Sequence, residues 1–214
     1  RWFAKNVGCW MSTPSAKGLL IAAPSSGAGK TTLTLALLRA LKTAGHRVVS
    51  AKSGPDYIDP KFHEAASGRP CINLDAWAMQ PDAIRSLAGA HSTGADLLIT
   101  EGAMGLFDGA ANGAGSAADL AAILKVPVLL VVDCAKQAQS VAALVQGFRD
   151  FRKDVTIAGV ILNRVGSAKH ENMLRAALHP LGLLVLGAIP RSDALTLPER
   201  HLGLVQAGEH HDIE

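Results

Sequence analysis

Aromatic residues and cysteines are scarce in this sequence, and their scarcity narrows what the chain can be. Phe, Trp and Tyr make up only 4% of the 214 residues, and the three cysteines (Cys9, Cys71 and Cys134) show neither CxxC nor Cys/His ligand spacing. The pattern therefore does not indicate a zinc site or a redox-active cysteine pair. Cys134 directly follows an apolar run and lacks the Gly-flanked turn that would expose a nucleophilic thiol. We interpret it as an ordinary buried cysteine.

The sequence also lacks strong charge of one sign and long apolar runs. Lys and Arg number 21 against 18 Asp and Glu, which gives a formal net charge of +3, and the basic residues are scattered. Such a distribution disfavours nucleic acid and anionic membrane surfaces as partners. The longest apolar stretches, such as residues 126–134, fall well short of the roughly 20 residues of a membrane span. No basic-then-apolar signal sequence opens the chain, so we expect a cytoplasmic protein.

The chain does have a high aliphatic content. Hydrophobic residues make up 49% of the sequence, which is enough for one well-buried α/β core at this length. Residues 1–16 carry no periodicity and are expected to be a leader or an artificial extension. Residues 17–214 are expected to form the single domain, with an abrupt end that suggests a partial chain.

From residue 17 onwards, short β-branched runs alternate with longer helical stretches. The expected strands are mostly apolar on both faces, as central parallel strands are, and span residues 18–24, 47–52, 96–100, 127–133, 157–163 and 183–189. The expected helices span residues 30–44, 82–90, 117–124, 138–151 and 169–179. Gly45 and Gly182 stand where C-cap glycines belong. The alternation predicts an α/β fold with a doubly wound, mostly parallel sheet, whose ligands gather at the carboxyl ends of the strands.

The strongest local signal is the segment APSSGAGKTT, residues 23–32, between an expected strand and an expected helix. Loop amides and the helix N-terminus can supply N–H donors to a triphosphate. Lys30 would neutralise the β- and γ-phosphates, and Thr31 would offer its hydroxyl to Mg²⁺. Pro24 departs from the usual motif, which has its first glycine there, because proline donates no N–H. The segment predicts that ATP is bound by Ser26, Gly27, Ala28, Gly29, Lys30, Thr31 and Thr32.

Two acidic segments also follow expected strands. KSGPDYIDP places Asp56 and Asp59 in a Gly/Pro-rich loop after Lys52, and EGAMGLFDG places Glu101 at a strand end and Asp108 in the loop beyond it. Carboxylates suit Mg²⁺, and these loops should share one sheet edge with the phosphate loop. Isolated loop acids are often only solvated turn formers, which stays an alternative for each of them. Lys52 is a candidate for stabilising charge at the γ-phosphate.

Polar residues follow the later strands as well. The amide of Asn163 offers one donor and one acceptor, as an adenine edge requires, although a turn-forming asparagine explains it equally well. Pro190 and Arg191 follow the last expected strand in the same way. All three are kept as candidates for nucleotide binding.

Seven segments, taken in order, resemble the cobyrinic acid a,c-diamide synthase family, whose members acting on the metal-free ring are called hydrogenobyrinic acid a,c-diamide synthases. The segments are APSSGAGKTT, KSGPDYIDP, EGAMGLFDG, VVDCAKQAQS, GVILNRVGS, GAIPRSD and LPERHLGLVQAGE. The resemblance runs from about Lys17 to the last residue. GPDYIDP and LPERHLGL are much more specific than the phosphate loop.

The resemblance implies a phosphate-loop fold of the dethiobiotin-synthetase-like type and a ligase of cobalamin biosynthesis. The implied reaction consumes ATP and glutamine to amidate the a- and c-acetate carboxylates of a corrin ring through acyl phosphates. Asp56 and Glu101 would then help Thr31 to hold Mg²⁺, and Asn163 would bind adenine. The implied contacts with the corrin or the acyl phosphate are Tyr57, Ile58, Asp59 and Asp108. With these roles, the expected catalytic residues are Lys30, Lys52, Asp59 and Asp108.

One part of that family's pattern has no match here, namely a second, glutaminase domain with a Cys nucleophile and a His/Glu pair. We therefore expect this chain alone to use free ammonia without hydrolysing glutamine, and the pattern leaves a homodimer open.

Related enzymes remain alternatives. Nickel-sirohydrochlorin a,c-diamide synthase shares much of the pattern, cobyric acid synthase is disfavoured by GPDYIDP and SSGAGKT, and dethiobiotin synthetase lacks LPERHLGL. A partition-type ATPase would carry an extra Lys early in the phosphate loop, where this chain has Pro24, Ser25 and Ser26.

Overall fold

The computed structural model describes residues 17–192 of the chain. The expected leader (residues 1–16), Cys9 and the LPERHLGL segment lie outside the described residues. The strands are β1 (Lys17–Ala22), β2 (Val48–Ser53), β3 (Cys71–Leu74), β4 (Leu97–Glu101), β5 (Val128–Asp133), β6 (Ile157–Val165) and β7 (Val185–Pro190). The helices are α2 (Lys30–Thr43), α3 (Asp59–Ser67), α4 (Pro81–His91), α5 (Ala117–Leu124), α6 (Val141–Phe151), α7 (Ala168–Leu178) and the 3-10 helix η1 (His179–Leu181).

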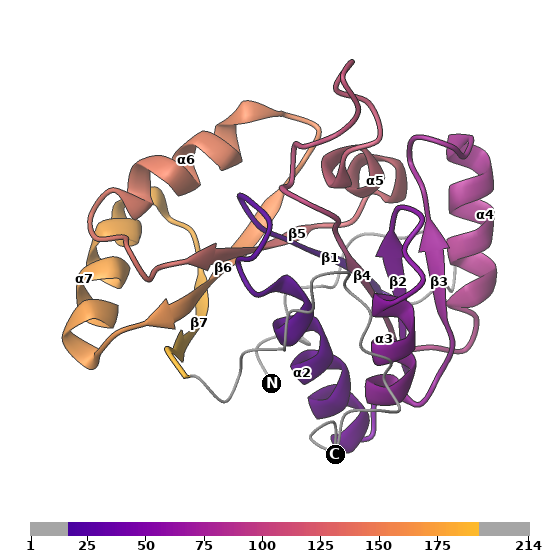
Figure 1. Cartoon of the computed structure of the whole chain (residues 1–214), viewed down its shortest axis with the longest axis horizontal. Coiled ribbons are helices and arrows are strands. Elements are labelled where there is room, and N and C mark those ends of the chain that lie inside the picture. The colour runs from indigo at the N-terminus through magenta and orange to yellow at the C-terminus, as the bar shows by residue number, and fades with distance from the viewer. Residues whose placement is uncertain (1–16, 193–214) are drawn as a thin grey trace.

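The strands form one sheet in the order β3-β2-β4-β1-β5-β6-β7 (Figure 1). Each pair of neighbours in this described sheet runs parallel. The predicted α/β class with a doubly wound sheet is therefore confirmed.

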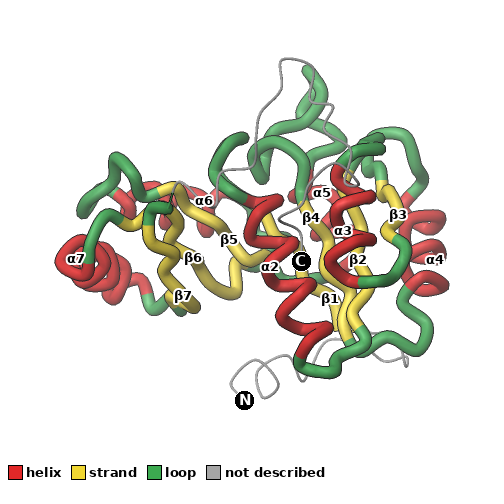
Figure 2. The backbone as a smooth tube through the Cα atoms, turned by 60° about the horizontal axis from the view of Figure 1, so that its bottom comes forward, coloured by secondary structure: helices red, strands yellow, loops and turns green. Residues whose placement is uncertain are grey.

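Helices cover both faces of the sheet, so the protein has three layers. One buried cluster joins the sheet to α2 and α3 through residues such as Leu33, Leu38 and Ala66. The other joins it to α4, α5, α6 and α7 through residues such as Ile84 and Leu174. Figure 2 shows α2 and α3 together in front of the strands. This division follows from the right-handed crossover of each strand–helix–strand unit.

The direction of the crossovers changes at the centre of the sheet. From β1, the chain passes through α2 to β2 on one side, whereas from β4 it passes through α5 to β5 on the other side of β1. The loops after β1 and β4 therefore diverge, and a crevice opens at the carboxyl ends of these strands.

Two short elements were not foreseen. The segment around Asp59 was expected to be loop, but Asp59 is the first residue of α3, with Pro60 in the first turn, where its missing N–H costs nothing. β3 has only four residues at the edge of the sheet and was also missed. The expected strands and helices overlap the other elements, with ends that differ by up to three residues.

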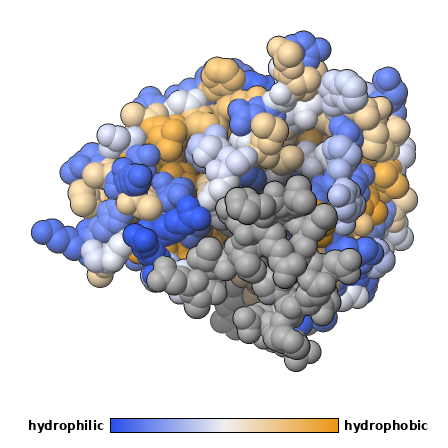
Figure 3. Space-filling view, viewed as in Figure 1, coloured by the Kyte–Doolittle hydropathy of each residue, from blue (hydrophilic) through white to orange (hydrophobic). Residues whose placement is uncertain are grey.

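The surface seen in Figure 3 mixes polar and apolar residues, with apolar residues gathered around α6. Phe148 and Phe151 of this helix both contact the ring of Phe107. None of the helices in residues 17–192 combines the length and the apolar character needed to cross a membrane.

Candidate active site

Strand register brings Lys52 and Glu101 together. They are paired across β2 and β4, so their side chains project from the same face of the sheet. Glu101 shares that face with Leu97 and Ile99, which pack in the cluster formed with α2 and α3. The carboxylate therefore points at the first turn of α2 and at the inner side of α3.

The Glu101 carboxylate is fully buried and hydrogen-bonded on both oxygens. Oε1 accepts from the Thr31 hydroxyl at 2.6 Å and from the Lys52 ammonium at 3.0 Å, and Oε2 lies 2.7 Å from Nε2 of His63. Burial alone would raise the pKa of Glu101, but the bond from His63 and the charge of Lys52 outweigh it and lower the pKa to about 2. Glu101 is thus a buried anion at neutral pH.

Lys52 connects Glu101 to the acidic loop that follows β2. Its ammonium lies 2.5 Å from Oδ2 of Asp59 and 3.8 Å from Oδ2 of Asp56. Burial opposes the charge of Lys52, yet Glu101 and Asp59 together raise its pKa above the usual range. Burial and the nearby Glu101 carboxylate raise the pKa of Asp59 as well, despite its bond to Lys52. On the far side of Glu101, His63 adds positive charge, because although burial lowers its pKa, its hydrogen bonds to Cys71 and Glu101 outweigh burial and raise the pKa to about 9.

The phosphate loop lies directly beside this cluster. Gly29 precedes α2 with a left-handed φ of 93°, which strains any other residue, and a Cβ at this position would displace the Asn163 amide. The Lys30 ammonium donates to the Met104 carbonyl at 2.5 Å, from the loop after β4. Burial lowers the pKa of Lys30, although the nearby Glu101 opposes the shift.

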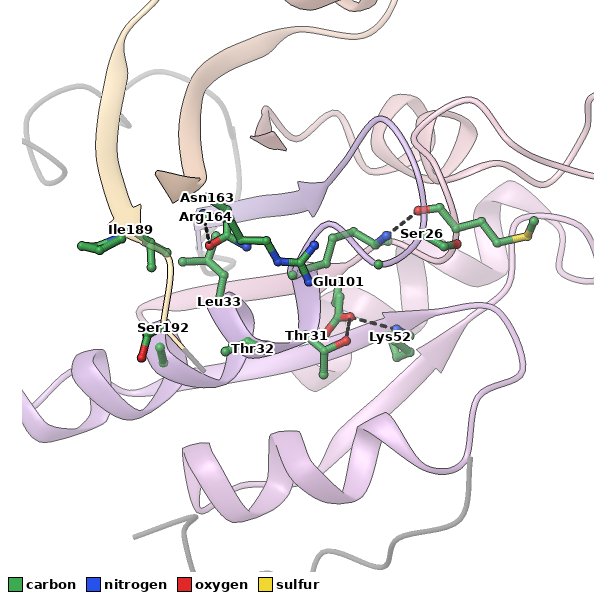
Figure 4. Close-up of a pocket in the computed structure, with 17 residues that line it drawn as sticks. Ser26, Thr31, Thr32, Leu33, Lys52, Glu101, Asn163, Arg164, Ile189 and Ser192 are labelled. Atoms are coloured by element: carbon green, nitrogen blue, oxygen red, sulfur yellow. Dashed lines mark hydrogen bonds and ion pairs between the residues drawn. The ribbon is translucent and has the colours of Figure 1, made fainter. Parts of the chain in front are cut away.

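A cavity of about 490 Å³ extends from the Glu101 cluster to the ends of β6 and β7. Figure 4 shows Thr31, Lys52 and Glu101 converging on one side of it, with Asn163 and Arg164 at the other. Its lining includes Ser26, Gly27, Gly29, Lys30, Thr31, Thr32, Lys52, Glu101, Asn163 and Pro190. This is a suitable size for an elongated phosphorylated ligand, because one end offers the ammonium groups of Lys30 and Lys52 and the other end carries the Asn163 amide.

The donor set beside the cavity fits Mg²⁺. The hydroxyl of Thr31 and the carboxylate of Glu101 are hard oxygen donors 2.6 Å apart at the N-terminus of α2. Within residues 17–192 there is no group of three or more His, Cys, Asp and Glu side chains that could hold a metal on its own. Mg²⁺ commonly binds through one or two protein ligands with phosphate and water oxygens completing its shell.

Asp56 lies at the same cluster but also fixes the local backbone. Its Oδ1 accepts from the amides of Ile58 and Asp59, so it orders the turn into α3. Tyr57 is 73% exposed and borders, with Asp56, a shallow cavity of about 300 Å³ between the loops after β2 and β4. The predicted substrate-facing residues Tyr57 and Ile58 thus lie next to the predicted metal site.

Asp108 holds the loop after β4 in place. Its Oδ2 accepts from the Gly105 amide at 2.9 Å, and the neighbouring Leu106 amide donates to the Ala23 carbonyl at the entry of the phosphate loop. The loop therefore rests on the backbone at Ala23 and Pro24.

The side chain of Asn163 is hydrogen-bonded to the phosphate loop. Its Nδ2 donates to the Ala28 carbonyl at 2.8 Å, and its Oδ1 accepts from the Arg164 amide. One amide hydrogen and one lone pair remain for a ligand. Pro190 borders the same cavity, whereas Arg191 lines a separate cavity of about 820 Å³ over the end of β5.

Sequence reasoning missed three residues of this region. His63 is fully buried against Glu101, Met104 supplies the carbonyl that Lys30 contacts, and Arg164 pairs with Asp133 at 2.6 Å beside Asn163. His63 follows Asp59 by four residues, which is one helical turn. That signal was hidden because the segment was not recognised as a helix.

Known protein families and individual proteins resemble this chain in sequence. The model of the family described as "CobQ/CobB/MinD/ParA nucleotide binding domain" matches residues 19–205. A protein of Brucella anthropi named hydrogenobyrinate a,c-diamide synthase is 65% identical over 199 residues, which cover 92% of this chain and 46% of that protein. A protein of Rhizobium meliloti with the same name is 59% identical over 197 residues, with the same two coverages. The chain spans about half the length of the curated relatives it matches.

A solved structure supports the fold alone. Chloroplast FtsY from Physcomitrella patens matches with a TM-score of 0.63 at 18% identity, over 87% of this chain and 62% of that one. At this identity the match concerns the arrangement of strands and helices.

Proposed function

This chain belongs to the CobQ/CobB/MinD/ParA nucleotide-binding domain family, and from that premise we propose that it uses ATP to activate carboxylates of a corrinoid acid for amide formation. The observation that carries the proposal is the cluster of Thr31, Glu101, Lys52 and Asp59 at the start of the helix that follows the phosphate loop. The names of the relatives from Brucella anthropi and Rhizobium meliloti support hydrogenobyrinic acid as the substrate.

The proposed reaction overcomes the poor electrophilicity of a carboxylate. A substrate carboxylate oxygen attacks the γ-phosphorus of ATP, and the bond to the β-phosphate oxygen breaks, which gives an acyl phosphate and ADP. Ammonia then attacks the acyl carbon, loses a proton, and displaces inorganic phosphate together with the original carboxylate oxygen. Lys30 and Lys52 stabilise negative charge on the transferring phosphoryl group. No covalent enzyme intermediate is required.

Magnesium belongs to this proposal as the partner of the nucleotide. Thr31 and Glu101 would hold it, with Asp56 close by, and when bound it supplies positive charge to the phosphates. Asp59, which shares the Lys52 ammonium with Glu101, keeps that ammonium at the mouth of the cavity. Asn163 and Pro190 would face the base, whereas Arg191 lines the separate cavity over the end of β5 and is given no contact with the base.

The substrate is proposed to approach from the side of the loops after β2 and β4. The shallow cavity beside Tyr57 opens there, and the exposed phenol ring offers a flat contact for a macrocycle. Ile58 and Asp108 belong to the same two loops, and Asp59 begins α3 directly after the first of them. In this proposal residues 17–214 form the synthetase domain, and in the whole protein ammonia comes from glutamine hydrolysed in another domain.

The direct experiment supplies the chain with Mg·ATP, ammonium chloride and hydrogenobyrinic acid, and analyses the corrinoid by mass spectrometry. The proposal predicts two carboxylates converted to amides, with ADP formed in proportion, and no glutamine hydrolysis by this chain alone. Glutaminase turnover by the chain would refute the last point. Sirohydrochlorin containing nickel, assayed in parallel, tests the nearest alternative substrate.

A switch of the partition type is the rival from another class, because the same family description includes MinD and ParA. Residues 24–26 are Pro, Ser and Ser, so the early lysine of such switches is missing from the loop. ATP-driven dimerisation together with salt-dependent DNA binding, in the absence of any amidation, would favour the rival.

A further inference from the structure

His63 is a fully buried imidazole whose Nε2 lies 2.7 Å from Oε2 of Glu101, the oxygen that neither Thr31 nor Lys52 contacts. We propose that His63 is a positioning residue, which holds the Glu101 carboxylate so that its other oxygen, Oε1, faces Thr31 and the metal-bearing phosphates. The inference rests on the proposed nucleotide and metal site, but it does not depend on which acid is amidated.

Glu101 needs such a partner because it is a charge without access to water. Its side chain has 0% exposure, and a buried carboxylate oxygen left without a donor carries a large desolvation penalty. Thr31 and Lys52 both donate to Oε1. Without His63, the terminal torsion of Glu101 would be fixed by donors on one oxygen only, and the carboxylate could turn away from Thr31.

The direction of the hydrogen bond follows from the chemistry of the pair. A carboxylate only accepts, so Nε2 of His63 must carry a proton toward Glu101. This holds for the neutral ring, whose Nδ1 then accepts from Cys71, and for the charged ring, which carries protons on both nitrogens. The positioning role therefore holds in both protonation states.

The ring is also fixed from its other side. Sγ of Cys71 lies 3.4 Å from Nδ1 of His63, at the start of β3. His63 itself lies on α3, whose first turn is ordered by Asp56 through the amides of Ile58 and Asp59. The acidic loop after β2 and the imidazole thus belong to one rigid unit, which is the usual arrangement of an outer residue that orients a metal-binding carboxylate.

The alignment of Cys71, His63 and Glu101 also resembles a thiol–imidazole–carboxylate triad, which would require a reactive thiol. The positioning role makes a different prediction, because Cys71 then only supports the ring. Replacing Cys71 by Ser, which keeps a hydrogen-bonding group for Nδ1, should leave both nucleotide binding and amidation within about threefold of the native chain, whereas a nucleophilic thiol would be indispensable.

The test compares His63→Gln, His63→Asn and His63→Leu by calorimetric titration with ADP, with and without Mg²⁺, on protein shown to be folded by circular dichroism. The amide nitrogen of Gln corresponds most nearly to Nε2, and that of Asn to Nδ1. The proposal predicts that His63→Leu and His63→Asn weaken Mg·ADP binding about tenfold or more, as outer-residue changes do at metal sites. His63→Gln should stay within about threefold, and metal-free ADP should bind all variants almost equally.

Three outcomes would overturn the proposal. The first is a folded His63→Leu that binds Mg·ADP like the native chain, and the second is an equal loss with and without the metal. The third outcome is equal affinity of the Gln and Asn variants for Mg·ADP. These two variants decide the question if His63→Leu does not fold. Because the readout is binding, a native chain that binds Mg·ADP yet fails to amidate a corrinoid acid would count against the proposed function and not against His63.

Discussion

The Lys52 ammonium lies 3.0 Å from the Glu101 carboxylate, across two neighbouring strands in register, and both side chains are almost completely buried. The pairing of β2 with β4 thus places a cation and an anion side by side on one face of the sheet. The alternation that buries Val48 and Leu97 against α2 and α3 also delivers Lys52 and Glu101 to the first turn of α2, where the phosphate loop ends.

Replacing Lys52 by Met should remove the charge while keeping the length of the side chain. Glu101 and Asp59 would then face each other without their shared cation, and breaking a buried pair in this way costs about 3–5 kcal/mol. We expect a loss of that order in the free energy of unfolding in urea, and a fall in amidation of about 100-fold or more. The double variant Lys52→Met/Asp59→Asn should recover part of the stability and none of the activity. A folded single variant with near-native activity would contradict the assignment.

The hydroxyl of Thr31 should contribute to nucleotide affinity only when Mg²⁺ is present. Thr31→Val keeps the branched shape but removes the oxygen that lies 2.6 Å from Glu101, whereas Thr31→Ser keeps that oxygen. We expect the Val variant to bind Mg·ADP about tenfold more weakly and the Ser variant to bind within about threefold of the native chain. Titration calorimetry checks this, and equal weakening of metal-free ADP would count against a metal ligand.

Gly29 and Gly45 form a matched pair, because both have a left-handed φ but only Gly29 is crowded. Alanine at either position should cost about 1–2 kcal/mol for the backbone conformation. At Gly29 the added methyl group would also overlap Asn163, whereas nothing lies within 4 Å at Gly45. Gly29→Ala should therefore lose nucleotide binding, and Gly45→Ala should only melt earlier. Similar nucleotide affinities for the two variants would show that the loop does not need this geometry.

Cys134 should be inert in the folded protein. Burial, with the neighbouring Asp133 charge, raises the pKa of its thiol to about 11, so at pH 8 roughly a thousandth of it is thiolate. Maleimide labelling mapped by mass spectrometry should modify Cys134 only after denaturation, with the partly exposed Cys71 as internal comparison. Rapid labelling of native Cys134 would reopen its role as a nucleophile.

The sequence was informative wherever short-range patterns determine structure. The apolar runs and the Gly-rich loop predicted the central strands and α2, and the rule that ligands gather at carboxyl ends of parallel strands predicted that Thr31, Asp56 and Glu101 would meet. The register that pairs Lys52 with Glu101 depends on how two strands distant in sequence align, so the contact itself was not predictable.

The missed part of the site has one physical origin. Pro60 and the preceding Gly/Pro-rich segment indicated a loop, although proline is well tolerated in the first turn of a helix. With α3 unrecognised, nothing marked His63 as a buried residue one turn beyond Asp59. Its partner Glu101 lies 38 residues away in sequence, beyond the reach of periodicity.

If ATP and a carboxylate react at this cluster, an oxygen atom of the carboxylate must pass to the released phosphate. Hydrogenobyrinic acid labelled with ¹⁸O in its acetate carboxylates is incubated with the chain, Mg·ATP and ammonia, and the released phosphate is analysed by mass spectrometry. We expect one ¹⁸O in the phosphate for each amide formed. Amide formation with unlabelled phosphate would contradict it.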